Sequence, residues 1–351
     1  MNKLKVLHLV STDVFSGAEN VACQIINGFA NDKNYEMIYC SPLGSNEVPL
    51  KNRNINHLIL KKFSYFYIRK AILYFKPDII HAHDIKASVI AALFAPKIKV
   101  VSHIHSNHEN MRKLDLKTIM FNTFTKKIDK IIWVSDSALE NYYFNKNVSL
   151  IDKSVVIYNV INPEEILKKS SEESIKKSYD IIYVGRLTYP KNPIRLIELL
   201  GLVKSKYPNL SAAIVGNGEY KETMLDIISK LELDKNIDML GFQNNPAAYM
   251  KKSKIMVMTS IYEGTPMCIL EAIAMGVPIV STPTDGISKI VENGVNGFLS
   301  DSNEELANYI VELLRNEKKY NLIKKNTIEL NKKINDFYGY IKKIDKIYKE
   351  I

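Results

Sequence analysis

Short apolar runs rich in β-branched residues alternate along the chain with longer stretches whose apolar positions recur at helical spacing. The runs are nearly continuous in apolar character, which is typical of parallel strands buried on both faces. Repeated strand–helix pairs predict a doubly wound α/β sheet. In the first half of the chain we expect strands at 5–10, 37–40, 78–81, 99–103, 130–134 and 154–158, and helices at 17–29, 85–94 and 111–126.

A second series of strands follows a change in composition. Residues 163–179 are rich in Glu, Lys and Ser and hold few apolar positions, which indicates a linker. Strands are expected again at 180–185, 210–216, 237–241, 254–258 and 278–281. The last stretch is helical and lysine-rich. The predicted organisation is therefore a domain over 1–162, a linker over 163–179, a second domain over 180–335 and a C-terminal helix over 336–351.

The bulk properties fit a two-domain protein of a reducing compartment. A chain of 351 residues can build two full cores. The cysteines Cys23, Cys40 and Cys268 lie far apart, without disulfide or zinc spacing. The apolar N-terminus lacks a cleavage site, and no apolar run approaches the length of a membrane span. We expect a cytoplasmic protein, with peripheral contact at the inner face of the cell membrane as an open alternative.

The chain is basic, with a formal net charge of +10 and a pI near 9.1. Such a balance suits nucleic acid, anionic lipid or phosphorylated substrates. No RNA-binding or helix-turn-helix signature accompanies the lysines, so we expect no nucleic-acid partner. The lysines become denser after residue 315. Two interpretations stay open, an ordinary solvated surface and attraction to an anionic membrane.

Two glutamates, Glu263 and Glu271, carry most of the functional information. Thr265 is a good N-cap and Pro266 a good first helical residue, so Glu263 should lie on a loop and Glu271 inside the helix that follows. The residues around Glu271 are apolar or alanine, and a carboxylate buried there needs a polar partner. The helix N-terminus also suits an anion. A phosphorylated ligand that carries hydroxyls would meet both needs.

The spacing of these glutamates resembles a family signature. Seven residues separate them, and Ala-x-Ala-x-Gly-x-Pro-Ile-Val follows, as in retaining family 4 glycosyltransferases. The resemblance implies the α/β GT-B fold, two Rossmann-like domains facing each other across a cleft, with a C-terminal helix that packs back on the first domain. The alternative is a surface glutamate beside a buried one that local backbone satisfies.

A second motif, Gly185-Arg186-Leu187 with Lys191 four residues later, follows the first strand of the second domain. In the family the corresponding Arg and Lys bind the donor diphosphate, and two cations can neutralise a pyrophosphate without a metal. Gly216 and Asn217 resemble a Gly-x-Gly turn beside the nucleotide. Gly241 and Phe242 stand where related enzymes hold the nucleobase.

The first domain carries a loop and a histidine group. Gly17 follows the first strand in a Ser-Gly-Ala-Glu turn, where the family usually has Gly-Gly-x-Glu, so Ser16 departs from the pattern. Histidines follow two strands, and five in one group also suggest a metal site, although no cysteine or acidic cluster joins them. The resemblance places His105, or next His103, against the donor sugar. The members of the group are His81, His83, His103, His105 and His108.

These observations predict a metal-independent retaining glycosyltransferase without a cofactor. Its donor is a nucleotide-diphosphate sugar, taken to be UDP-linked, that carries a hexose or N-acetylhexosamine. Its acceptor is a cell-envelope glycan (capsule, lipopolysaccharide, teichoic acid or exopolysaccharide), as a glycan or lipid-linked intermediate. The alternatives are another GT-B sugar-nucleotide enzyme such as an epimerase, and a non-catalytic basic binding module.

The predicted site divides into catalytic and donor-binding residues. Glu263, His105, Arg186 and Lys191 are the catalytic candidates. The resemblance implies that Glu271 binds the ribose hydroxyls and Glu263 the sugar hydroxyls. Near 285–289, Asp285 and Lys289 replace a Gly and a Glu of the family, so those two contacts cannot be transferred. The donor-binding candidates are Gly17, Arg186, Lys191, Gly216, Asn217, Gly241, Phe242, Glu263, Gly264, Thr265, Pro266, Met267 and Glu271, with His103 and Gly286 as further candidates.

Overall fold

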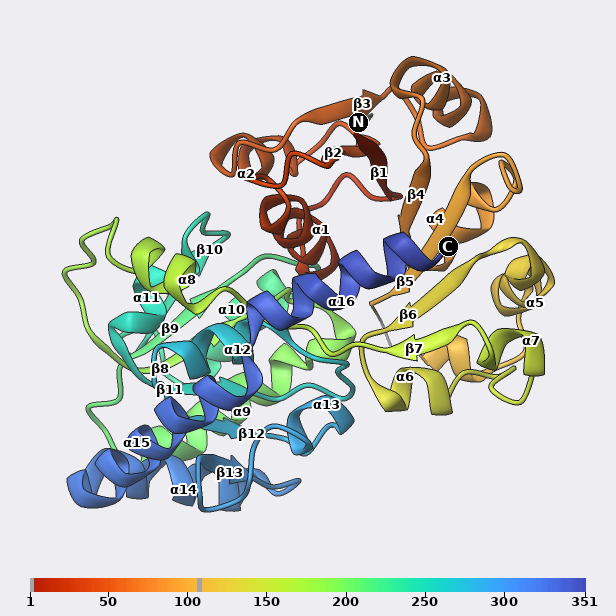
Figure 1. The fold of residues 1–351 in the computed structure, drawn as a ribbon. Coiled ribbons are helices and arrows are strands. Elements are labelled where there is room, and N and C mark those ends of the chain that lie inside the picture. The colour runs from red at the N-terminus through yellow and green to blue at the C-terminus, as the bar shows by residue number, and fades with distance from the viewer. Residues whose placement is uncertain (1–2, 106–108) are drawn as a thin grey trace. The chain divides into compact units, whose positions relative to one another are not determined.

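A computed structural model of the protein describes residues 3–105 and 109–351, and the chain divides into two compact units (Figure 1). Unit 1 comprises Met1–Asn159 and Phe337–Ile351, and unit 2 comprises Val160–Asp336. Each unit holds one parallel sheet with its own core. The predicted α/β, doubly wound fold class is confirmed.

The sheet of unit 1 has seven strands in the order β3-β2-β1-β4-β5-β6-β7. Helices α3, α4, α5 and α7 contribute to one large core cluster, and α1 contributes to a separate one. The strands are β1 (Leu4–Val10), β2 (Tyr35–Pro42), β3 (His57–Leu60), β4 (Ile79–His83), β5 (Lys99–Ile104), β6 (Lys130–Trp133) and β7 (Ser154–Val156). The helices are α1 (Gly17–Gly28), α2 (Glu47–Asn52), α3 (Tyr65–Phe75), α4 (Asp84–Ala91), α5 (Leu116–Phe124), α6 (Asp136–Glu140) and α7 (Val148–Ile151).

The C-terminal helix α16 (Phe337–Glu350) belongs to unit 1. A side chain at Gly28 would come within 2.3 Å of Ile341 Cδ1, so this glycine lets α16 pack closely on α1. Tyr35 donates a hydrogen bond to Asp345 across 2.7 Å. The helix is therefore fixed to unit 1 by both apolar packing and a partly buried hydrogen bond.

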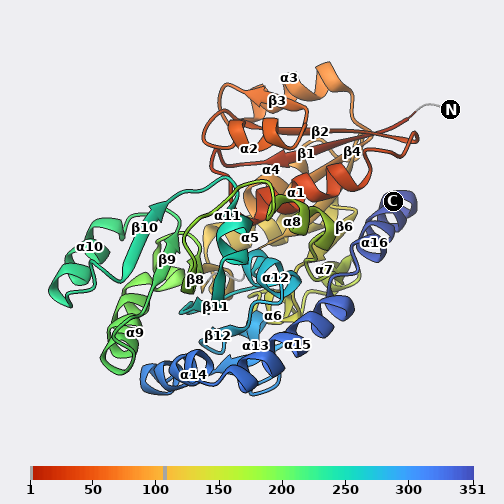
Figure 2. The same ribbon diagram turned by 90° about the vertical axis from the view of Figure 1, so that its left-hand side faces the viewer.

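Unit 2 contains a six-stranded parallel sheet in the order β10-β9-β8-β11-β12-β13. Figure 2 shows the strands of this sheet with α9 and α10 near β9 and β10. The strands are β8 (Tyr179–Val184), β9 (Ala212–Val215), β10 (Ile237–Gly241), β11 (Ser253–Met258), β12 (Ile279–Ser281) and β13 (Gly297–Leu299). The helices are α8 (Pro163–Lys169), α9 (Pro193–Lys206), α10 (Lys221–Lys230), α11 (Pro246–Lys251), α12 (Met267–Ala274), α13 (Asp285–Ser288), α14 (Asn303–Arg315) and α15 (Glu317–Ile334).

The structure differs from the sequence-based expectation in several places. Residues 163–179 are part of unit 2 rather than a separate linker, because α8 begins at an Asn162 cap and packs against α11 and α12. The helix expected from residue 111 begins only at Leu116, where the Asp115 carboxylate accepts a hydrogen bond from the Thr118 amide. Strands β3 and β13 were not predicted, since both are short edge strands. Among the described helices, none is long and apolar enough to cross a membrane.

Candidate active site

The predicted donor-binding residues of unit 2 follow strands β8, β9, β10 and β11. The sheet is parallel, so these loops emerge at the same edge. Strands β9 and β10 follow one another on one side of β8, whereas β11 pairs with the other side of β8. The strand order therefore reverses between β8 and β11. Ligands of doubly wound sheets bind outside the carboxyl ends of the strands at such a reversal.

Glycines hold these loops close together. At Gly216, where φ is +144°, a Cβ atom would lie 1.8 Å from the Gly185 carbonyl oxygen, and at Gly286 it would lie 1.2 Å from that of Gly264. The Gly216 amide donates to the Gly241 carbonyl across 2.8 Å. Any side chain at Gly216 or Gly286 would push two loops apart. Gly286 therefore acts here through its small size, in contact with the loop that carries Glu263.

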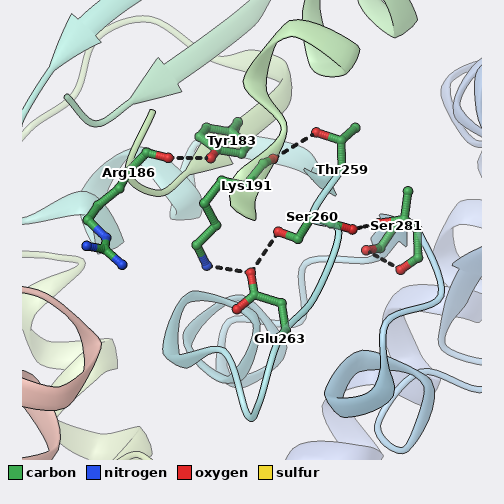
Figure 3. A network of polar contacts seen from close by, with 8 residues as sticks. Tyr183, Arg186, Lys191, Thr259, Ser260, Glu263 and Ser281 are labelled. Atoms are coloured by element: carbon green, nitrogen blue, oxygen red, sulfur yellow. Dashed lines mark hydrogen bonds and ion pairs between the residues drawn. The ribbon is translucent and has the colours of Figure 1, made fainter. Parts of the chain in front are cut away.

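Lys191 and Glu263 form a buried ion pair between the loops after β8 and β11 (Figure 3). The exposed fractions of their side chains are 17% and 10%. Ser260 donates to the same carboxylate oxygen across 2.7 Å. Burial by itself lowers the pKa of Lys191, but the Glu263 carboxylate outweighs it and the pKa is raised, so the ammonium stays charged. The ion pair therefore holds an ammonium group and a carboxylate side by side in a mainly buried environment.

Arg186 is exposed, and its backbone rather than its guanidinium is held in place. Its carbonyl accepts a hydrogen bond from the Tyr183 hydroxyl across 3.1 Å. Its guanidinium has no hydrogen bond or ion pair within the part of the chain that the structure describes. Figure 3 shows the guanidinium and the Lys191 ammonium extending toward the same side of the loop. The two cations can therefore meet one anionic ligand.

Helix α12 begins at Met267, one residue later than predicted, with Pro266 rather than Thr265 at the N-cap position. Glu271 lies inside this helix, as expected, and is 9% exposed. Thr265 and Met267 are also buried, and Gly264 precedes them on the loop. Helix α12 packs against α8, α11 and α15, which accounts for its apolar character on all sides.

Strands β9 and β10 end in the residues predicted to border the nucleotide. Gly241 has a φ of +67° with open space around its missing side chain, so its backbone conformation alone favours glycine. Phe242 follows with an exposed fraction of 51%, and Asn217 is exposed on the next loop. An exposed aromatic ring beside a polar amide can stack on a planar base.

In unit 1, Gly17 is the first residue of α1 and Ser16 is its N-cap. Both the amide and the hydroxyl of Ser16 donate to Glu19 Oε2, across 2.9 and 2.6 Å, and Thr12 donates to Glu19 Oε1 across 2.6 Å. Serine therefore adds a helix cap where the family usually has glycine. The small residue at position 17 remains at the start of the helix.

Three histidines of unit 1 form a hydrogen-bonded row. His8 Nδ1 lies 3.1 Å from His83 Nε2, and His83 Nδ1 lies 2.7 Å from His105 Nε2. Burial lowers the pKa of His8 and of His105 to about 3, and that of His83 well below its usual value, so the rings are neutral at pH 7. A neutral ring carries one proton, so all three must share one tautomer. His105 can then address a ligand only through Nδ1, which has no partner among the described residues.

A second row joins the C-terminal helix to the sheet. The Tyr348 hydroxyl lies 2.5 Å from His81 Nδ1, and His81 Nε2 lies 3.1 Å from His103 Nδ1. His103 is completely buried, and its ring stacks on that of His105 at 4.1 Å between centroids. His103 therefore supports His105 from within the core.

Ring nitrogens of His81, His83 and His103 lie within 4.8 Å of one another, close enough to share a metal ion. Both nitrogens of His81 and both of His83 already take part in hydrogen bonds. A metal ion would have to replace several of these bonds in a fully buried position. His108, the fifth member of the predicted group, lies outside the described residues.

Sequence reasoning missed several residues of these networks, among them His8, Ser260 and Tyr348. The signal for His8 was a polar residue inside an otherwise apolar run. Tyr348 lies in the C-terminal helix, for which only packing on the first domain was expected. Ser260 stands three residues before Glu263, and nothing in the sequence distinguishes it from other loop serines.

Comparisons with known proteins define the class. The model of the family described as Glycosyltransferase Family 4 matches residues 15–165, and that described as Glycosyl transferases group 1 matches residues 164–330. The crystal structure of Anabaena Alr3699/HepE in complex with UDP and glucose shares the fold, with a TM-score of 0.85 over 99% of this chain and 100% of that chain, at 21% identity. The protein is thus a transferase of the GT-B fold. It belongs to the group 1, family 4 glycosyltransferases, as the sequence predicted.

Two curated relatives show the range of similarity. The chain is 26% identical to the UDP-Gal:alpha-D-GlcNAc-diphosphoundecaprenol alpha-1,3-galactosyltransferase of Escherichia coli, over 99% of this chain and 96% of that protein. It is 31% identical to the uncharacterized glycosyltransferase MJ1059 of Methanocaldococcus jannaschii, over 61% of this chain and 58% of that protein.

Proposed function

We propose that the protein is a retaining glycosyltransferase that moves a hexose or N-acetylhexosamine from a UDP-sugar to a cell-envelope glycan, as a lipid-linked intermediate at the inner face of the cell membrane. The observation that carries this proposal is the ion pair of Lys191 and Glu263 at the strand-order reversal of unit 2, with Arg186 on the same loop as Lys191 and Glu271 in the helix that follows the Glu263 loop. The name of the Escherichia coli relative, a galactosyltransferase acting on a diphosphoundecaprenol acceptor, supports the choice of donor and acceptor.

Each residue has a separate role in this proposal. Arg186 and Lys191 bind the diphosphate and stabilise its negative charge as it leaves. Glu271 accepts hydrogen bonds from the ribose hydroxyls, Glu263 from the sugar hydroxyls. Phe242 and Gly241 border the base with Asn217 and Gly216. The family resemblance assigns donor contacts to Gly17 and His105 of unit 1 as well.

The proposed transfer takes place on one face of the sugar. The bond between the anomeric carbon and the diphosphate oxygen breaks, and a bond from the acceptor oxygen forms on the same face. The acceptor hydroxyl proton passes to the leaving phosphate, so the products are the new glycoside and UDP. No protein base is needed, and the charge that develops on the phosphate is stabilised by Arg186 and Lys191.

A thermal-shift panel tests the donor. Because a ligand that binds only the native state raises stability by mass action, about 2.7 kcal/mol at a hundredfold excess over Kd, UDP and at least one UDP-sugar should raise the melting temperature. GDP-mannose serves as the matched control. A shift with GDP-mannose and none with UDP would refute the proposed donor. Consumption of the UDP-sugar to an isomeric sugar without an acceptor would instead identify an epimerase.

Activity should survive chelation. The sequence holds no Asp-x-Asp motif, and the two cations of the β8 loop supply the charge that a metal ion supplies elsewhere. Excess EDTA is therefore expected to leave most of the turnover intact, measured as release of UDP. Complete loss of turnover that Mn²⁺ restores would contradict metal independence and point to the buried histidines.

A further inference from the structure

The outer side of α3 has an unusual composition for a solvent-exposed surface. Six exposed residues recur on one side of the helix, at positions i, i+1, i+4, i+5, i+8 and i+9, and the opposite side packs into the core. All six are aromatic, aliphatic or basic, and none is acidic. Tyr74 is 77% exposed and Phe66 is 57% exposed. This α3 stripe consists of Tyr65, Phe66, Arg69, Lys70, Leu73 and Tyr74.

The stripe continues over the neighbouring helices of unit 1. The Tyr65 ring stacks on Phe94, which follows α4, with 5.0 Å between centroids. Helix α4 in turn packs against α5, and Figure 1 shows α3, α4 and α5 in succession along one side of the sheet. Around α5, Leu114 and Leu116 are 57% and 72% exposed. Together these residues make an extended outer face with large apolar side chains.

Basic side chains outnumber acidic ones in the two segments that contribute to this outer face. Residues 61–76 contain five basic and no acidic side chains. Residues 112–127 contain five basic side chains and one acidic, Asp115, which caps α5. On α15 and α16, lysines lie beside carboxylates on the same helix, as in Lys332–Glu329 and Lys349–Asp345.

We propose that the outer face of unit 1, centred on the α3 stripe, binds the surface of an anionic lipid bilayer. Exposed aromatic and aliphatic side chains interleaved with cations are typical of helices that lie in a membrane interface, and each lysine or arginine near an anionic surface adds to the attraction. A second copy of the chain fits less well, because the same cations would face each other. The proposal rests on the proposed function in one respect: a lipid-linked acceptor is presented at such a surface.

Vesicle co-sedimentation of the full chain tests this surface. The wild type should bind vesicles of phosphatidylcholine with phosphatidylglycerol, bind phosphatidylcholine alone more weakly, and release from the anionic vesicles as salt rises. The variants Phe66→Ser/Tyr74→Ser and Arg69→Gln/Lys70→Gln should each weaken binding at least about tenfold. Matched controls on α15, Leu322→Ser and Lys324→Gln/Lys325→Gln, should bind as the wild type does.

Three results would overturn the proposal: α3 variants that bind like the wild type, a wild type that ignores anionic vesicles, or loss of binding in the α15 controls instead. A dimer in solution that Phe66→Ser/Tyr74→Ser dissociates would assign the face to a protein contact. The thermal shift that UDP causes should be the same in these variants as in the wild type. This measurement separates the membrane-surface hypothesis from the proposed glycosyltransferase function. A wild type that binds vesicles but no UDP-sugar would remove the proposed function and leave the membrane surface standing.

Discussion

Replacing Arg186 with alanine should lower kcat/KM for the UDP-sugar by about 10- to 150-fold, the equivalent of one lost charge-assisted hydrogen bond of about 1.5–3 kcal/mol. The melting temperature without ligand should stay unchanged, since the guanidinium is exposed and makes no contact within the described chain that holds the fold. Steady-state kinetics and a melting curve of the same preparation measure both effects.

The matched control is Lys235→Ala. Lys235 is also an exposed cation of unit 2, but it stands before β10, at the opposite edge of the sheet from Arg186. This variant has the same change in net charge and should keep wild-type kinetics. If both variants keep wild-type kinetics, Arg186 does not belong to the donor site. If both variants lose activity to the same extent, the loss is a general effect of charge.

Local sequence patterns located the central strands, the loop that carries Glu263 and the helix that carries Glu271. The Gly-Thr-Pro run after Glu263 placed that residue on a loop and Glu271 inside the helix, and the structure agrees within one residue of the helix start. Short apolar runs located the central strands, because a buried parallel strand must be apolar on both faces. The edge strands β3 and β13 were not predicted, because strands of four and three residues are too short to show that pattern clearly.

The pairings within the site could not be predicted, because they depend on which strands are neighbours. Lys191 and Glu263 are 72 residues apart, and they meet only because β8 and β11 pair in the sheet. His8 and His83 are 75 residues apart, and Tyr348 and His81 are 267 apart. The sequence analysis predicts two separate contacts, Lys191 with the diphosphate and Glu263 with the sugar hydroxyls. The structure joins them in one pair, so a ligand that reaches either side chain must fit the other.

Glu271→Gln should weaken UDP-sugar binding by about 10- to 150-fold while the protein stays folded. The reason is that hydrogen bonds from hydroxyls to a charged carboxylate are worth about 1.5–3 kcal/mol, and the isosteric amide removes the charge without changing the volume. Glu271 is 9% exposed inside an apolar helix, and a carboxylate in such a position needs polar partners. Titration calorimetry with UDP gives the affinity, and a melting curve gives the stability.

Asp180→Asn is the matched control for this experiment. Asp180 is also 9% exposed, but it lies near the start of β8, where it accepts hydrogen bonds from the Ser211 amide across 3.1 Å and from Lys254 across 2.9 Å. The loss of that charge should lower the melting temperature and leave UDP affinity unchanged. If Glu271→Gln gives this same pattern, the carboxylate is structural and the ribose assignment fails. If it instead lowers affinity at an unchanged melting temperature, the buried charge of α12 serves the nucleotide.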